Sequence, residues 1–396
     1  MTNRLGTGGG KHRPYNVEIG EYRGRSCACP DVSLFLVSLL SFLLLATTCG
    51  FAQSKIVRVL ICKSNTSLTL SSRCPVTMKA GNEILKREKR LKKIVLKRKG
   101  DSIKFGSGRY KTLDFISKGF SISVNGRAYV GDIRISVHGK QIFAVNYVGM
   151  ESYLKSVVPS EMPSTWPIEA LKAQAVVART YVLYHKAGPS KEYDLYSGIK
   201  SQMYKGVCSE GSNSNMAMYL TEKMCLYDNG KLVPTYYHST CGGQTLNADS
   251  IWERALDSIE GVDCGFCKDS IHYRWKKSIG RRKLGKILSR NGYKIGKIKT
   301  MRVTKGNPYK IFIEDKYGKS QVLDVSKFRT LVGSEVIRSN NFRVKVGWFR
   351  VKFKGNGWGH CVGLCQWGAR GMAIKGYSYK QILQHYYPNL DLKRLF

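Results

Sequence analysis

The sequence predicts an α+β protein with a β-rich N-terminal part, a central helix region and a smaller inserted α+β segment. Three observations support this: alternating apolar residues between Gly and Asn turns early in the chain, one strong helical pattern near its middle, and a second mixed pattern after that. A chain of 396 residues can bury a large core and form more than one structural unit. The expected parts are a leader at 1–52, a β-rich region at 53–147, a core region at 148–275, an inserted α+β segment at 276–352, and a glycine-rich loop and helix at 353–396 that complete the core.

The first 52 residues have the pattern of an export signal. Residues 32–48 form an uncharged apolar run, and four arginines and one lysine precede it. Gly50 and Ala52 supply the small residues expected just before a cleavage point after Ala52. The run is borderline in length for a membrane span, so an uncleaved N-terminal anchor stays open as an alternative. The sequence therefore predicts an exported protein whose membrane contact, if any, is through an uncleaved leader.

Strand patterns fill the β-rich region. Residues 56–62, 121–124, 128–137 and 141–148 alternate or cluster β-branched and aromatic residues between Gly and Asn turns. Within this region Lys86–Lys99 is a basic tract opposed by Glu88. Such a tract is usually a solvated face. The more specific alternative is that it adsorbs to an anionic polymer.

The most informative segment surrounds Glu161. Pro159, Pro163 and Pro167 restrict the backbone, so we expect Glu161 in a rigid turn before a helix that starts at Pro167. The helix carries an apolar stripe, and several alanines leave room for another backbone to approach closely. Lys172 and Arg179 are seven residues apart and are expected on one helix face. A carboxylate beside two aligned cations is a plausible site for a sugar and an anion.

The rest of the chain predicts two further elements. Strand patterns at 299–305, 310–315 and 342–353 indicate a small α+β segment. A glycine-rich run then leads into an expected final helix at 379–386.

Four motifs occur in the order seen in the SpoIID/LytB family, which the chain resembles over about residues 55–396. They are PSEMP at 159–163, EALKAQAVVART at 169–180, YHSTCGGQT at 237–245 and GWGHCVGLCQWGARGMA at 357–373. The resemblance implies action on bacterial cell-wall glycan whose peptides have been removed, or assistance to the amidases that remove them. It makes 148–275 the catalytic core, Glu161 the catalytic acid, and Lys172 and Arg179 the cations of the family's helix.

The resemblance predicts a lytic transglycosylase that cleaves peptide-free peptidoglycan strands between MurNAc and GlcNAc and leaves 1,6-anhydro ends. Glu161 would serve as general acid and then base, because attack by the sugar's own C6 hydroxyl removes the need for a second carboxylate. Lys172 and Arg179 would hold lactyl carboxylates. The remaining predicted substrate-binding residues are His238, Ser239, His360 and Gln366. Trp166, Trp358 and Trp367 are either core residues or platforms for sugar rings.

The alternative is a non-catalytic glycan-binding protein that recruits or enhances an N-acetylmuramoyl-L-alanine amidase. Charge cannot separate the partners: Lys plus Arg is 66 against 27 Asp plus Glu, a formal +39, which suits either peptide-free glycan or nucleic acid. The export pattern decides against nucleic acid. It places the protein in the periplasm or at the outer face of the cytoplasmic membrane.

The cysteines allow three interpretations. The chain has 12 cysteines, and an odd number of them follow Ala52, so they cannot all pair internally. Four thiolates from Cys241, Cys264, Cys267 and Cys365 would match one structural zinc, and no cofactor is needed for the proposed chemistry. Disulfides and simple buried thiols remain open. Some members of the family hold zinc through Cys and His a little after the catalytic helix, but the matching stretch here, 193–207, contains neither.

Overall fold

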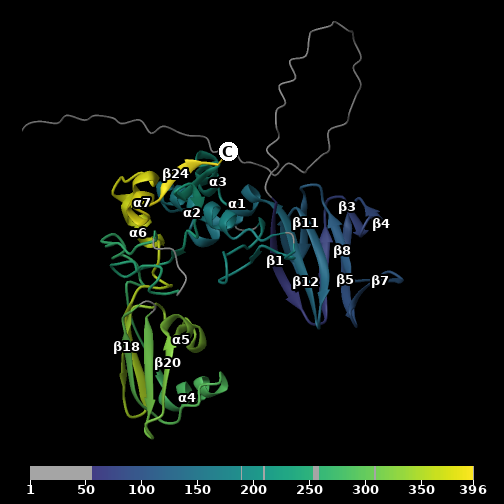
Figure 1. Ribbon diagram of the computed structural model, residues 1–396. Coiled ribbons are helices and arrows are strands. Elements are labelled where there is room, and N and C mark those ends of the chain that lie inside the picture. Colours follow the sequence, from purple (N-terminus) through teal and green to yellow (C-terminus); the bar gives the residue numbers. More distant parts are fainter. Residues whose placement is uncertain (1–55, 189, 208–209, 253–257, 307–308, 396) are drawn as a thin grey trace, which may run out of the picture. The chain divides into compact units, whose positions relative to one another are not determined.

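The computed structural model describes residues 56–188, 190–207, 210–252, 258–306 and 309–395. The predicted leader at 1–52, including the apolar run and the cleavage point after Ala52, lies outside these ranges. No helix in the described ranges has both the length and the apolar character needed to traverse a bilayer. The predicted α+β class is confirmed, with strands dominating the first part of the described chain (Figure 1).

Two sheets make up the β-rich region. The first has the order β13-β1-β12-β11-β8-β3-β4, and β1 and β12 pair antiparallel with Ile56 opposite Gly149. Along β12 buried side chains recur at alternate positions, as expected for a sheet with one face on the core. Its strands are β1 (Ile56–Ser64), β3 (Val76–Ala80), β4 (Glu83–Glu88), β8 (Thr112–Ile116), β11 (Asp132–His138), β12 (Gln141–Gly149) and β13 (Leu195–Tyr196).

The second sheet has the order β10-β9-β2-β5-β6-β7. Its strands are β2 (Ser67–Ser72), β5 (Leu91–Lys99), β6 (Ser102–Phe105), β7 (Gly108–Tyr110), β9 (Ser121–Val124) and β10 (Arg127–Val130). The basic tract, Lys86–Lys99, forms the second half of β4 and all of β5. On β5, Leu91 and Leu96 are buried whereas Lys92, Lys93 and Lys97 are exposed, so the strand presents a solvated basic face.

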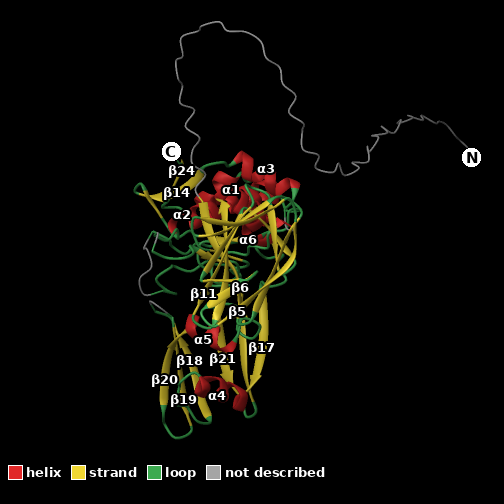
Figure 2. Ribbon diagram, turned by 90° about the vertical axis from the view of Figure 1, so that its right-hand side faces the viewer, coloured by secondary structure: helices red, strands yellow, loops and turns green. Residues whose placement is uncertain are grey.

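Five helices form the region that carries Glu161. They are α1 (Met150–Glu161), α2 (Ile168–Tyr184), α3 (Ser212–Leu220), α6 (Gln366–Ile374) and α7 (Tyr379–Tyr386). Helices α6 and α7, from the end of the chain, pack beside α2 (Figures 1 and 2). The final helix has the predicted bounds, because Ser378 and Gln381 form a capping box at its start.

The structure corrects two expectations about this region. Glu161 is the last residue of α1 rather than part of a turn, because the helix continues for two residues beyond Pro159, whose missing N–H removes one intrahelical hydrogen bond without ending the helix. Pro167 is the residue before α2 rather than its first helical residue. In addition, α2 is buried on nearly all sides from Ala170 to Thr180, because α1, α3, α6, α7 and β14 surround it.

Short strands connect this helical region. β14 (Met224–Asp228) lies between β15 (Lys231–Leu232) and β24 (Asp391–Arg394). β16 (Tyr237–His238) and β23 (Leu364–Cys365) form a parallel pair in which Tyr237 lies opposite Leu364 and His238 opposite Cys365. This pair brings two sequence motifs that are more than a hundred residues apart into direct contact.

The segment between Arg274 and Asn356 has an apolar cluster of its own, which includes Phe328, Phe342 and Phe353. It contains two three-stranded sheets, β17-β22-β21 and β18-β19-β20, with two helices. The elements are β17 (Arg274–Gly280), α4 (Arg281–Arg290), β18 (Ile298–Thr304), β19 (Lys310–Asp315), β20 (Ser320–Asp324), α5 (Val325–Val332), β21 (Phe342–Val346) and β22 (Arg350–Asn356). These elements start and end a few residues outside the predicted range of 276–352.

Candidate active site and cysteine cluster

The Glu161 carboxylate is held by groups from three other parts of the chain. Its Oε1 accepts hydrogen bonds from the backbone N–H of Met203, at 2.7 Å, and from the Tyr237 hydroxyl, at 3.1 Å. The Gln366 side-chain amide lies 3.5 Å from Oε2, at the limit of a hydrogen bond. These partners come from the loop after β13, from β16 and from the first residue of α6. The end of α1 is thereby fixed against both distant sequence motifs.

Burial dominates the electrostatics of this carboxyl group. It raises the pKa of Glu161, because removing a carboxylate from water penalises its charged form. The hydrogen bonds from Met203, Tyr237 and Gln366, and the nearby charge of Lys205, lower the pKa but do not cancel the effect of burial. A carboxyl group with a raised pKa that keeps hydrogen-bond partners is suited to donate a proton near neutral pH.

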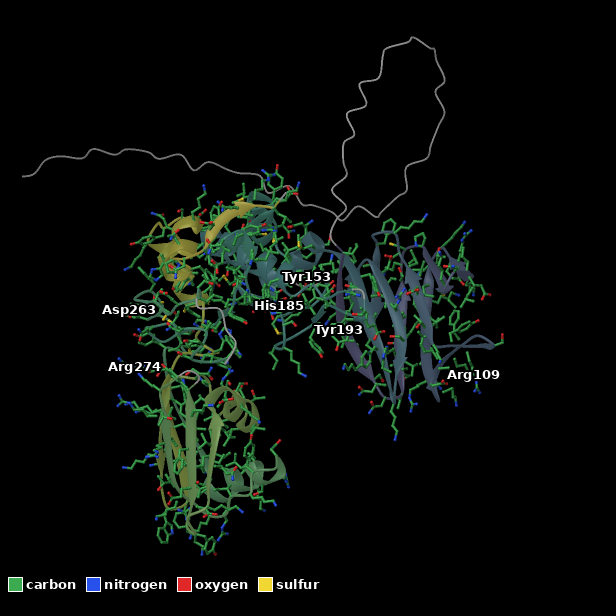
Figure 3. All side chains as sticks on the ribbon, viewed as in Figure 1. Arg109, Tyr153, His185, Tyr193, Asp263 and Arg274 are labelled. Carbon is green, nitrogen blue, oxygen red and sulfur yellow. The ribbon has the colours of Figure 1, made fainter. Side chains whose placement is uncertain are left out.

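A layer of buried polar side chains supports these partners. Gln174, which is fully buried on α2, has its Oε1 3.4 Å from the Gln366 amide nitrogen. Tyr153 is labelled in Figure 3, and its hydroxyl donates to Gln202 Oε1 at 3.1 Å. The Gln202 amide in turn donates to Ala178 O. This layer restricts where the groups around Glu161 can move, as a reactive site requires.

Arg179 is not placed to bind a substrate, contrary to the expectation. Its side chain is 0% exposed and forms two hydrogen bonds to the Glu151 carboxylate, at 2.8 and 2.9 Å. It also donates to Thr221 O and Met224 O. The expectation was wrong because α2 is surrounded by other helices, so a cation in its middle serves to join them.

None of the described contacts of Lys172 is with Glu161. Its ammonium group pairs with Glu169 at 2.6 Å and lies over the Tyr379 ring. The cation with a described electrostatic effect on Glu161 is Lys205, which is exposed. Nothing in the sequence pointed to Lys205 or to the backbone N–H of Met203. Tyr237 could have been predicted, because it is the first residue of the YHSTCGGQT motif.

The other predicted substrate-binding residues have different surroundings. His238 is buried, its Nδ1 lies 3.1 Å from Val362 O, and burial lowers its pKa to about 4, so its ring is neutral at pH 7. His360 accepts from Val362 N and packs against Tyr236 and Trp252. The Ser239 carbonyl accepts from Trp367 N. Of the four predicted residues His238, Ser239, His360 and Gln366, it is Gln366 that has a described contact with Glu161.

Trp166 and Trp367, two of the three tryptophans predicted as core residues or sugar platforms, form one half-buried group. The rings of Trp166 and Trp367 meet edge to face at 5.2 Å between centroids, and the Arg370 guanidinium lies over both. Trp358 contacts His272 and Arg338 instead. The Trp166–Trp367 pair joins the segment just after Glu161 to the start of α6.

The four cysteines singled out in the sequence converge. The sulfur atoms of Cys241, Cys264, Cys267 and Cys365 all lie within 4.8 Å of one another, and all four residues are buried. The Cys241 and Cys267 sulfurs are 3.5 Å apart, and none of the four forms a disulfide. We refer to these four residues as the cysteine cluster.

Comparisons with known proteins identify the family. A model of the family described as Stage II sporulation protein matches residues 138–227, which contain α1, α2 and Glu161. An uncharacterized protein of Brachyspira hyodysenteriae is 31% identical over 279 residues, which cover 68% of this chain and 73% of that protein. The chain belongs to the SpoIID/LytB family, as its four motifs indicated.

Two relatives have descriptive names. The amidase enhancer of Bacillus subtilis is 27% identical over 74% of this chain, which spans about half of that protein (49%). The stage II sporulation protein D of Bacillus amyloliquefaciens is 26% identical over 66% of this chain and 78% of its own length.

Proposed function

We propose that this protein acts on the bacterial cell wall as a lytic transglycosylase, cleaving peptide-free glycan strands between MurNAc and GlcNAc. The observation that carries the proposal is the environment of Glu161. Burial raises the pKa of this carboxyl group, and the described partners of its oxygens are an amide, a phenol and a backbone N–H, none of them a carboxylate. Membership of the SpoIID/LytB family supports the cell-wall role.

The chemistry needs one carboxyl group that changes role. Protonated Glu161 gives its proton to the glycosidic oxygen as the bond from C1 of MurNAc to O4 of GlcNAc breaks through an oxocarbenium-like state. The C6 hydroxyl of the same MurNAc then forms a bond to C1, and its proton goes to Glu161. The enzyme returns to its starting state, no water is consumed, and the strand ends in 1,6-anhydro-MurNAc. Tyr237 and Met203 stabilise the carboxylate in the interval between the two proton transfers.

Lys205 is proposed to recognise the anionic substrate in place of Arg179. Removal of the peptide exposes a lactyl carboxylate on each MurNAc, and Lys205 is an exposed cation that acts electrostatically on Glu161. The reaction that supplies this substrate is hydrolysis of the amide between the lactyl group and the peptide. An N-acetylmuramoyl-L-alanine amidase is therefore the expected functional partner, and export to the periplasm or to the outer face of the cytoplasmic membrane is expected.

The decisive experiment compares the wild-type protein with Glu161→Gln on purified peptide-free glycan. The wild type should release fragments with anhydro-MurNAc ends, detected by mass spectrometry. Glu161→Gln should lower the rate by about 10²–10⁴-fold, since a general acid contributes that much, while glycan binding persists. Equal release of anhydro ends by the two proteins would overturn the assignment.

A second candidate function is stimulation of an amidase without cleavage of glycan, as the name of the Bacillus subtilis relative suggests. In that case Glu161 would only hydrogen-bond to sugar. The two functions separate when amidase activity on intact peptidoglycan is measured with added Glu161→Gln protein. Full stimulation by this variant, together with no anhydro products from the wild type, would favour the enhancer function.

A further inference from the structure

We propose that the cysteine cluster binds one zinc ion, and that this ion fixes the two segments that touch Glu161. The metal-binding part of the proposal is independent of the reaction. Only the predicted effect of the metal on glycan cleavage rests on the proposed function.

The donor set fits tetrahedral zinc. With Zn–S bonds of about 2.3 Å, four sulfurs around zinc lie about 3.8 Å from one another. The four sulfurs here lie within 4.8 Å of one another, with Cys241 and Cys267 at 3.5 Å. Four buried thiols with no disulfide among them form a closed site, so the metal would have no open position for water or substrate and would serve a structural role.

Groups around the cluster are arranged to stabilise thiolates. The Cys365 sulfur accepts hydrogen bonds from the backbone N–H groups of Cys241 and Gly368, each at 3.3 Å. The Tyr386 hydroxyl lies 3.0 Å from the Cys264 sulfur. Such outer contacts orient the ligands of metal sites and spread the negative charge of the sulfurs.

Helix α6 lies directly against the cluster. A Cβ atom added at Gly368 would come within 2.7 Å of the Cys264 sulfur, and one added at Gly371 would come within 2.0 Å of Phe266 O. Two glycines three residues apart therefore let the helix contact the Cys264–Cys267 turn. Cys365 is the N-cap of the same helix.

The cluster adjoins the residues that hold Glu161. Gln366 follows Cys365 directly, and Tyr237 lies four residues before Cys241. The β16–β23 pair joins the same two segments, but it consists of only two residues on each side. A zinc ion would cross-link these segments much more strongly than that short pair, and so fix the Tyr237 hydroxyl and the Gln366 amide near the carboxylate.

The first test is metal content. The full chain, purified under reducing conditions, should contain one zinc per chain by elemental analysis, and cobalt substitution should give the absorption of tetrahedral cobalt–thiolate coordination. Cys267→Ser should lose most of the metal. The matched control is Cys361→Gly, because Cys361 is a buried cysteine of the same motif outside the cluster, and its φ of 68° suits glycine.

Two measurements on the wild type keep the proposal testable even if Cys267→Ser fails to fold. The proposal is overturned if the purified wild type contains no metal and a thiol reagent modifies all four of its cluster cysteines as fast as in the denatured protein. Mass spectrometry of the intact wild type provides a further check. A mass lower by two hydrogens per disulfide, with the cluster cysteines joined in pairs, would also overturn the proposal. Removal of zinc from the wild type should abolish glycan cleavage and lower the melting temperature. Failure of the wild type to cleave glycan at all would count against the proposed function and leave the metal measurement intact.

A separate observation supports a second inference. We propose that three exposed aromatic residues of the 274–356 segment, Tyr317, Trp348 and Phe349, contact an anionic lipid surface. Their exposed fractions are 75%, 75% and 79%. They are close together: Lys297 Nζ lies 5.5 Å from the Trp348 ring centre, and Lys297 O accepts from the N–H of Lys316, which precedes Tyr317.

Cations surround these aromatic residues. Arg282, Lys286 and Arg290 on α4, together with Lys297, line a hollow of about 880 Å³ with Trp348 and Phe349. Lys316 Nζ lies over the Tyr317 ring. The acidic groups nearby are occupied: Asp315 accepts backbone N–H groups from Gly296, Tyr317 and Lys319, and Glu314 pairs with Lys299.

This arrangement favours lipid over sugar. The rings of Trp348 and Phe349 lie at 76° to each other in the turn between β21 and β22, so they do not form one flat platform for a sugar ring. Protruding aromatic rings ringed by lysine and arginine are typical of residues that enter the interface of an anionic membrane.

The test is co-sedimentation of the full chain with vesicles of phosphatidylglycerol and phosphatidylcholine in equal amounts, and with vesicles of pure phosphatidylcholine. The double variant Trp348→Ala/Phe349→Ala should lower binding to the anionic vesicles by at least about tenfold, because it removes the apolar surface that both rings would bury in the membrane interface. Tyr219→Ala is the matched control, because Tyr219 is also 75% exposed but lies on α3. Equal vesicle binding by the double variant, or loss of glycan binding without any vesicle binding, would overturn the proposal.

Discussion

Glu161 owes its chemistry to residues far from it in the sequence. The motif identified the carboxylate, but its partners Met203, Tyr237 and Gln366 come from segments that only the fold brings together. Tyr237 and Gln366 lie inside motifs and were open to prediction. Met203 contributes a backbone N–H, which any residue except proline would offer at that position, so its side chain carried no signal.

The raised pKa of Glu161 predicts how stability changes with pH. Because the folded protein holds the proton more tightly than the unfolded chain, this group's contribution is complete below its unfolded pKa of about 4.3 and is lost as the pH rises through the folded pKa. Glu161→Gln should therefore be more stable than the wild type at pH 8, and the difference should shrink towards pH 4. Urea denaturation of both proteins across this range provides the measurement. A difference that does not depend on pH would show that the folded pKa is not raised.

Lys205→Gln should weaken recognition of peptide-free glycan. The positive charge of Lys205 lowers the pKa of Glu161, so its removal should raise that pKa further and shift the alkaline limb of the pH–rate profile upwards. KM should increase several-fold, because a cation near the lactyl carboxylates is lost. Lys172→Gln is the control, since the described contacts of Lys172 are with Glu169 and Tyr379. Identical profiles for the two variants would contradict the proposed role of Lys205.

Elements with a strong local pattern were predicted from the sequence, whereas features that depend on tertiary contacts were not. The strands near 56–62 and 310–315 and the helix at 379–386 were predicted closely because alternation and capping are local signals. Helix α1 was missed because Pro159 and Pro163 suggested a turn around Glu161. The full burial of α2 also could not be predicted, since α6 and α7, which cover it, follow nearly two hundred residues later.

Arg179 illustrates the consequence for function. Arg179→Ala should destabilise the protein by about 3 kcal/mol, because it leaves the Glu151 carboxylate and the carbonyls of Thr221 and Met224 without their donor. Thermal and chemical denaturation measure this loss. At temperatures where the variant is folded, its affinity for peptide-free glycan should equal that of the wild type. A selective loss of glycan affinity with unchanged stability would restore the role that the sequence suggested.

For the whole molecule, the formal charge of +39 predicts electrostatic attraction to an anionic cell-wall polymer. The charge is distributed over separate surfaces, including the exposed lysines of β5 and the basic side chains of α4, so many weak contacts with a polyanion add together. Such contacts between exposed charges are screened by salt and carry little information about the sequence of sugars. If the proposed function holds, selectivity for peptide-free strands comes from the free lactyl carboxylates.

The salt concentration and the charge of the glycan should act separately, the first on long-range attraction and the second on recognition at the site. Peptide-free glycan should bind several-fold more weakly when the salt concentration rises from low to physiological values, because screening shortens the range of the attraction. Glycan whose lactyl carboxylates are converted to methyl esters should bind weakly at every salt concentration and should be cleaved slowly. The esterified strand keeps the sugars and the C6 hydroxyl, so it is a matched substrate in which only the charge has changed. Equal binding and cleavage of the two glycans would mean that sugar contacts alone select the substrate, and that the positive charge of this protein serves another partner.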